Sequence, residues 1–121
     1  LLLNKMNFYK MSPLMMASMV GHTHIVRTLL DAGAKVNARD QGGVSALHKA
    51  SWMGFDETVK VLIDSGADVN MPRHDGITPY ALAESSTVEG RTQEQANKVM
   101  KLLEDAGATK PKKEKIEMND L

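Results

Sequence analysis

The chain has no cysteine, which excludes disulfides, thiolate metal sites and cysteine nucleophiles. Its formal net charge is zero, so no overall field draws in nucleic acid or an anionic membrane. No apolar run approaches the ~20 residues that span a bilayer. The first residues also lack the basic region and cleavage pattern of a secretory signal. We therefore expect an intracellular protein, located in the cytoplasm or the nucleus, that has no membrane partner. Aromatic residues make up only 4% of the chain, and Trp52 is the single tryptophan.

What the sequence does contain is an internal repeat. At a shift of 33 residues, positions 12–14 (SPL) align with 45–47 (SAL) and with 78–80 (TPY). Segments 7–39 and 40–72 are identical at 12 of 33 positions, where average composition gives about two. A fixed period of this length indicates stacked supersecondary units.

Each unit carries the signals for two helices. A Ser or Thr followed by Pro or Ala starts the first helix, which we expect at 14–20, 47–53 and 80–86. Gly21 and Gly54 end it, and Thr23 and Asp56 stand where the N-cap of a second, amphipathic helix is expected. The predicted inward core residues are Leu14, Ala17, Val26, Leu29, Leu47, Ala50, Val59 and Leu62.

Three motifs, "SPLMMASMVGHTHIVRTLLDAGAKVN", "SALHKASWMGFDETVKVLIDSGADVN" and "TPYALA…KLLEDAGA", resemble the ankyrin repeat family over about residues 3–108. The resemblance implies an all-α solenoid of helix–turn–helix units with projecting hairpin-like loops. Short first helices would line its concave face. We expect an ankyrin-repeat domain at 1–109, with a partial hairpin at 1–6, repeats at 7–39, 40–72 and 73–109, and a charged, flexible tail at 110–121.

The two ends of the array differ from its middle. The third unit carries an insertion between its helices, near 86–93, and then a capping box at Thr92–Gln95. At the other end, Met15, Met16, Val20 and Ile25 stand where residues of a repeat normally pack against the preceding one. We therefore hypothesise a longer ankyrin array or a multidomain protein.

Residues suited to catalysis or metal binding do not form a recognisable site. His22 and His24 are two residues apart, whereas two ligands on one helix face are three or four apart. His48 occupies the histidine of the family's Thr-Pro-Leu-His motif, which implies hydrogen bonds to neighbouring backbone. Lys49 replaces the usual apolar residue, and we expect its stem along the core with its amine outside. We expect no enzyme activity, cofactor or metal.

The resemblance implies that contact residues lie on the hairpin tips and at the exposed ends of the first helices. Trp52 is then expected on the concave side, outside the core, in an apolar strip edged by Arg39 and His74. The alternative is that Trp52 folds down between the helices. The candidate partner-binding residues are Phe8, Tyr9, Met11, Met19, Arg39, Val44, Trp52, Met53, His74 and Ile77.

These features predict a non-catalytic module that binds another protein or a peptide. One alternative is a regulatory or targeting segment of a larger enzyme whose catalytic domain lies outside this chain. Another is a small-molecule or nucleic-acid binder on the same face. The latter needs a cluster of Lys or Arg near Trp52, and the sequence supplies only Lys10 and Arg39 there. Nucleic acid is therefore the less favoured partner.

Asn70 is a candidate modification site by resemblance. Ankyrin repeats similar to "LIDSGADVN" (62–70) are substrates of an asparaginyl hydroxylase in animals. Leu62, Asp68 and Val69 match that preference, whereas the equivalent Asn37 has Lys35 in place of the Asp. The other interpretation is that the Asn70 side chain simply ties the loop together.

Overall fold

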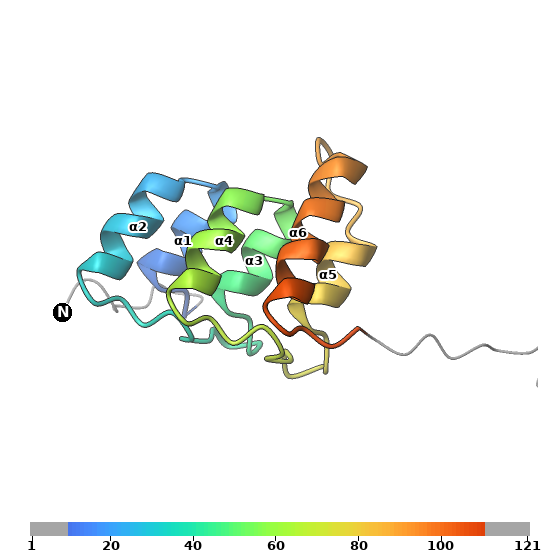
Figure 1. The fold of residues 1–121 in the computed structure, drawn as a ribbon. Helices are drawn as coiled ribbons and strands as arrows, with labels where there is room; N and C mark the ends of the chain where they lie inside the picture. Colours follow the sequence, from blue (N-terminus) through green and yellow to red (C-terminus); the bar gives the residue numbers. More distant parts are fainter. Residues whose placement is uncertain (1–9, 111–121) are drawn as a thin grey trace, which may run out of the picture.

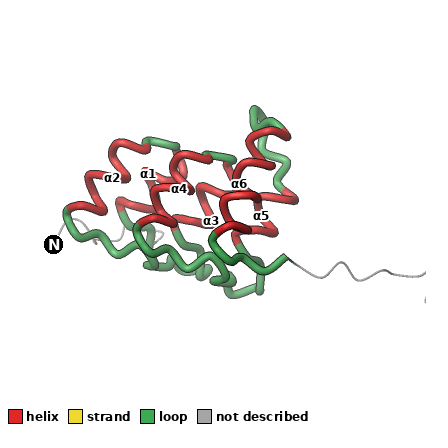
Figure 2. Tube along the Cα trace, viewed as in Figure 1, coloured by secondary structure: helices red, strands yellow, loops and turns green. Residues whose placement is uncertain are grey.

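The computed structural model describes residues 10–110, which form two rows of helices. The helices are α1 (Pro13–Val20), α2 (Thr23–Asp31), α3 (Ala46–Met53), α4 (Asp56–Asp64), α5 (Pro79–Ser85) and α6 (Gln93–Asp105). Helices α1, α3 and α5 form one row and α2, α4 and α6 the other (Figure 1). The long loops project from one edge of the stack (Figure 2). The predicted all-α solenoid is confirmed. The partial hairpin 1–6, Phe8, Tyr9 and tail residues 111–121 lie outside the described residues.

Short polar side chains start the first helix of each unit, as predicted. Ser12 Oγ accepts a hydrogen bond from the Met15 N–H, and Thr78 Oγ1 does the same for a backbone N–H of α5. Each hydroxyl satisfies a donor that the helix leaves unpaired. Gly21 and Gly54 then end α1 and α3 with φ of 75° and 79°, a left-handed conformation that costs glycine little.

The second helices of the first two units, α2 and α4, begin differently from the prediction. Thr23 and Asp56 are the first helical residues of α2 and α4 rather than their N-caps, and neither helix has a side-chain cap. The Thr23 hydroxyl instead lies 2.9 Å from the Thr58 hydroxyl of the next unit. This hydrogen bond joins α2 to α4, so the Thr23 side chain serves the contact between units.

The apolar core runs continuously through the stack, between the two rows and between successive units. Leu14, Leu47 and Leu62 are at most 1% exposed. All of the predicted inward residues are buried except Leu29, which is only half-buried. Leu29 lies on α2, and within residues 10–110 no helix packs against the outer side of the α1–α2 pair.

Asparagine side chains tie the loops of successive units together. Asn37 Nδ2 donates to the Gly66 carbonyl at 3.1 Å, and Asn37 Oδ1 accepts from the Asp68 N–H at 2.8 Å. Asn70 makes the equivalent pair of bonds to the loop that follows α6. Because both carbonyl and amide of each side chain are used, the spacing between neighbouring loops is fixed at two points.

The longer connection between α5 and α6 is held by Arg91. Its guanidinium donates to the carbonyls of Ala83 at 2.7 Å and Ser86 at 2.8 Å, which satisfies acceptors at the end of α5. The Thr92–Gln95 capping box then starts α6, as predicted. The Arg91 stem lies directly against Gly54, so the connection also packs on the preceding unit.

We predict that Gly54→Ala destabilises the fold more than Gly66→Ala does. Both glycines have positive φ, so each alanine adds about 1–2 kcal/mol of backbone strain. A Cβ at Gly54 would also meet Arg91 Cδ at 2.6 Å, whereas one at Gly66 would meet nothing within 4 Å. We expect this crowding to cost about 1 kcal/mol more. Urea unfolding of the two variants measures the difference, and equal losses would contradict the described packing of Arg91.

Candidate functional site

An open pocket of about 320 Å³ lies on the side of the stack formed by the first helices and the loops. It spans three successive units, since α1, α3, α5 and two loops contribute to it. Its lining residues are Met19, Val44, His48, Lys49, Trp52, Met53, Arg73 and Leu82. Four of them, Met19, Val44, Trp52 and Met53, are among the predicted partner-binding residues.

Trp52 lies outside the core, as predicted. Its side chain is 37% exposed, and Met19, at the same repeat position one unit earlier, is 38% exposed. The alternative that the indole folds down between the helices is therefore wrong. The aromatic side chain of Trp52 and the flexible side chain of Met19 thus line an open pocket, where part of their apolar surface is accessible to a partner.

Four other predicted contact residues lie within the described part of the chain. Met11 and Ile77 are partly buried, and Met11 packs against the core. Arg39 and His74 are exposed on the two loops. None of these four lines the pocket, so the continuous apolar strip that the sequence predicts is present in part among the described residues. Their contact with a partner remains a prediction.

Arg39 and His74 link the two loops to one another. Arg39 Nε donates to the carbonyl of Gly43 in its own loop, and Arg39 Nη2 donates to the carbonyl of Pro72 in the next loop at 2.6 Å. The His74 N–H donates to the Gly42 carbonyl at 3.0 Å. Arg39 and His74, which were predicted to edge the binding surface, therefore also hold the two loops beside the pocket together.

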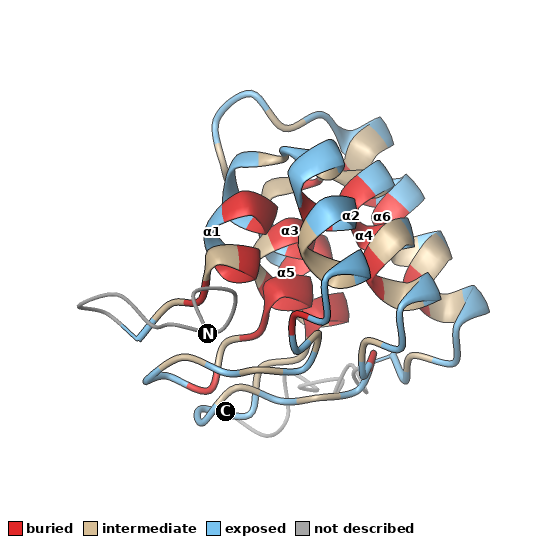
Figure 3. Cartoon of the chain, turned by 90° about the vertical axis from the view of Figure 1, so that its left-hand side faces the viewer, coloured by how far each residue is buried: buried red, intermediate tan, exposed pale blue. Residues whose placement is uncertain are grey.

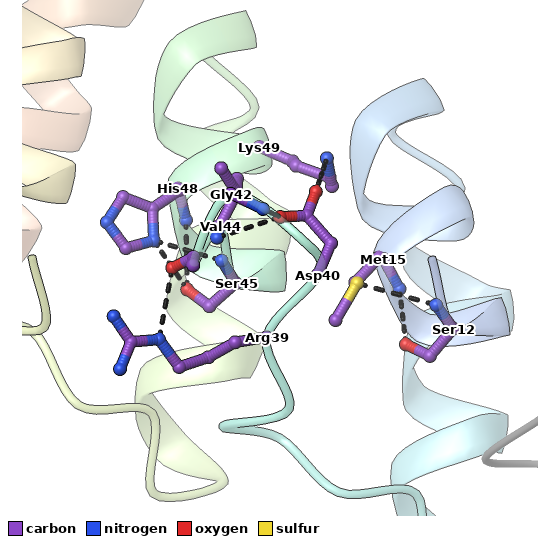
Figure 4. A network of polar contacts seen from close by, with 10 residues as sticks. Ser12, Met15, Arg39, Asp40, Gly42, Val44, Ser45, His48 and Lys49 are labelled. Atoms are coloured by element: carbon purple, nitrogen blue, oxygen red, sulfur yellow. Dashed lines mark hydrogen bonds and ion pairs between the residues drawn. The ribbon is translucent and has the colours of Figure 1, made fainter. Parts of the chain in front are cut away.

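Lys49 and Asp40 form an ion pair that the sequence analysis missed. Lys49 Nζ lies 3.2 Å from Asp40 Oδ2, with the two side chains 12% and 13% exposed, so the expectation of an amine in solvent is wrong. Asp40 Oδ1 also accepts from the N–H groups of Gly42 and Val44 (Figure 4). Burial raises the pKa of the Asp40 carboxyl, but these donors and Lys49 more than offset it and lower the pKa overall.

His48 forms part of the pocket floor, and its hydrogen bonds determine its tautomer. Nδ1 faces the Ser45 N–H at 3.1 Å, which can only donate, so Nδ1 must accept (Figure 4). Nε2 lies 3.2 Å from the Ile77 carbonyl, which can only accept, so Nε2 carries the proton. The ring is fully buried, and this burial lowers the pKa of His48 to about 4. The expected bonds to neighbouring backbone are confirmed.

Four lining residues, His48, Lys49, Arg73 and Leu82, were not predicted as part of the site. The repeat register contained one usable signal, because Lys49 and Leu82 occupy the same position in successive units. Arg73 enters the lining through its loop, where it pairs with Asp75 at 2.6 Å. Such a position depends on how the loop folds back over the helices.

The described residues contain no cluster of three or more His, Asp or Glu side chains that could hold a metal ion. The chemistry available at the pocket is therefore apolar contact, two cations with carboxylate partners, and a neutral imidazole whose nitrogens are both in use. Over residues 10–110, every helix is too short or too polar to cross a bilayer.

Comparison with known proteins identifies the repeat. A family model described as ankyrin repeats (3 copies) matches residues 1–73. That match includes α1 to α4, whereas α5 and α6 lie beyond it. No curated protein matches the chain.

We predict that His48 makes the stability of the fold dependent on pH. Since its pKa in the folded state is about 4 and lies below the ordinary value of 6.5, the unfolded chain binds the proton first as the pH falls. The stabilisation that neutral His48 gives to the fold is therefore fully present above pH 6.5 and is lost as the pH falls toward 4. We expect the free energy of unfolding to decrease by on the order of 2 kcal/mol over this range.

Urea unfolding at several pH values in this range provides the measurement. The His48→Gln variant is the control, because it is less stable at neutral pH but lacks this ionisation. If the two proteins lose stability in parallel as the pH falls, another group is responsible.

Proposed function

Because the chain belongs to the ankyrin-repeat family, whose members generally act as protein–protein interaction modules, we propose that it binds another protein through the pocket around Trp52 without performing catalysis. The observation that carries the proposal is the exposure of Trp52 and Met19 beside that pocket. Exposed apolar side chains that gather on one surface are typical of interaction sites. Tryptophan is prominent among interface hot spots, and methionine adapts its shape to a partner.

The bound segment is an extended peptide or a helix that lies along the first helices. It inserts an apolar side chain between Trp52 and Met53 and covers Met19 at the neighbouring unit. The hydrogen bonds between units hold the pocket wall before binding, so little conformational entropy is lost when the partner docks. The lack of cysteine accords with an intracellular location for this complex.

The cations near the pocket favour an apolar partner over a nucleic acid. Lys49 pairs with Asp40 and Arg73 pairs with Asp75, while the Arg39 guanidinium donates to two backbone carbonyls. A phosphate backbone requires several cations whose charge is available, and carboxylates offset the charges of Lys49 and Arg73. If the chain is a regulatory segment of a larger enzyme, it binds its partner through the same pocket. This alternative differs from the main proposal only in the activity of the rest of the polypeptide.

We predict that Trp52→Ala weakens partner binding by about 2 kcal/mol or more, roughly thirtyfold, because it removes the central apolar contact. The unfolding midpoint should change little, because Trp52 is neither in the apolar core nor among the partly buried side chains that pack against it. Protein captured by the wild-type chain is identified, purified and titrated against both forms. In the wild type, the fluorescence of this single tryptophan reports binding directly.

Ile25→Ala is the matched control, because Ile25 is 47% exposed but does not line the pocket. Equal affinity of all three proteins would refute the pocket as the binding site. A salt-sensitive complex with a single-stranded oligonucleotide, in the absence of protein binding, would favour the nucleic-acid alternative.

We retain the hydroxylation of Asn70 as a separate proposal. The residue is exposed on the loop after α4. Its side-chain amide forms hydrogen bonds with the Gly107 carbonyl and the Thr109 N–H, so an unmodified Asn70 already links the two loops. Mass spectrometry of the native protein should show the Asn70 peptide heavier by one oxygen atom. An unshifted peptide would leave Asn70 with the structural role alone.

A further inference from the structure

The charged side chains that line the pocket around Trp52 are both cations. Lys49 and Arg73 belong to the lining, and among the described residues no acidic side chain does. Asp40 and Asp75 pair with these two cations but do not line the pocket. A bound segment therefore meets apolar groups and cationic groups rather than carboxylates.

Both of these carboxylates are engaged within the chain. Asp40 accepts from two backbone N–H groups through Oδ1 and lies 3.2 Å from Lys49 Nζ through Oδ2, with its side chain only 13% exposed. Asp75 accepts from Arg73 through both of its oxygens. Neither carboxylate is placed to attract a cation of a partner into the pocket.

Arg39 carries a charge that no carboxylate offsets. Its Nε and Nη2 donate to the carbonyls of Gly43 and Pro72, which are neutral. Over residues 10–110, no carboxylate lies within ion-pair distance of Arg39. Because each of the two lining cations is balanced by a carboxylate, one positive charge remains at this site when histidine is counted as neutral.

The Arg39 guanidinium lies at the edge of the pocket. Gly43 and Pro72, to which it donates, directly precede the lining residues Val44 and Arg73. Figure 3 looks along the stack and shows the loops at its edge, coloured largely as exposed or intermediate. A segment that fills the pocket thus passes close to an exposed cation.

The floor of the pocket senses the same charge. Burial is the main cause of the low pKa of His48, and the positive charges of Arg73 and Arg39 lower that pKa further. Figure 4 shows Arg39 and His48 near the start of α3. In the part of the chain that the structure describes, Arg39 Nη1 makes no hydrogen bond, so its two N–H groups are available to a carboxylate.

We propose that this pocket selects a peptide in which a large apolar residue lies within about three positions of an Asp or Glu. The apolar side chain enters the space beside Trp52 and Met53, and the carboxylate accepts from Arg39 Nη1. Three extended residues span at most about 11 Å, which is enough to reach from a lining residue to the loop beside it. The inference rests on the proposed function and adds the chemistry of the bound segment.

Other occupants match this arrangement less well. A basic residue at the same place would bring a like charge to Arg39, with both nearby carboxylates already paired. A nucleic acid presents successive phosphates, and one unbalanced cation offsets only a single negative charge. The charge at the site therefore favours one carboxylate beside an apolar group.

The first test selects short peptides of known sequence. A random peptide library displayed on phage is panned on the 121-residue chain, and clones that bind the Trp52→Ala variant equally well are discarded. The retained clones should share a large apolar residue with an Asp or Glu nearby. Retained clones without that acidic residue would overturn this proposal and leave the pocket as a binding site. If no clone depends on Trp52, the proposed function fails as well.

The second test reverses the charge of Arg39. A selected peptide is synthesised with its acidic residue kept, replaced with Gln or replaced with Lys, and the anisotropy of a dye on the peptide reports its affinity. For the wild type, Gln should weaken binding about fivefold. Arg39→Glu should invert the preference, so that the Lys peptide binds more tightly than the acidic one. Loss of the loop contacts alone would weaken all three peptides alike and would contradict the proposal.

Arg27→Glu is the matched control, because Arg27 is exposed on α2 and does not line the pocket. It changes the net charge by the same amount and should leave the preference for the acidic peptide intact. If it inverts that preference as Arg39→Glu does, the overall charge of the chain is responsible and the proposal fails. Sedimentation tests a second copy as the occupant, since a dimer that Trp52→Ala dissociates would also overturn the proposal.

Discussion

The contact of each helix pair with the next is the interaction on which the rest of the structure depends. Thr58 and Leu62 are fully buried because α2 lies over α4, and a single unit has no other means of covering them. The pocket depends on the same contact, since Met19, Trp52 and Leu82 come from α1, α3 and α5. Loss of register between units would therefore separate the pocket residues before any helix unfolded.

Polar groups give this apolar stack its fixed spacing. His48 accepts from Ser45 within its own unit and donates to Ile77 in the next, so a single neutral ring joins two units. Asn37 and Arg39 make comparable links between loops. Each bond is local and has a defined direction, whereas apolar burial alone would permit sliding between units. The binding surface is consequently formed in advance of any partner.

Features that depend on short stretches of sequence could be predicted. The Ser12 cap and the glycine after α1 rest on neighbouring backbone, and the exposure of Trp52 was implied by the resemblance to ankyrin repeats. The Lys49 ion pair could not be predicted, because it requires the loop that carries Asp40 to fold back over α3. Leu29 was assigned to the core because the register describes an interior unit, and in the described residues α2 lies at the end.

The anchoring of the connection 86–92 has a practical consequence for protein engineering. Arg91 returns the chain to the end of α5, and Thr92 starts α6 with its own cap, so both ends of the connection are held. Thr87, Glu89 and Gly90 between them are exposed. A foreign epitope or affinity tag grafted at 87–90 would thus be displayed from a stable base, on a segment that contributes neither to the pocket nor to the outer side of α2.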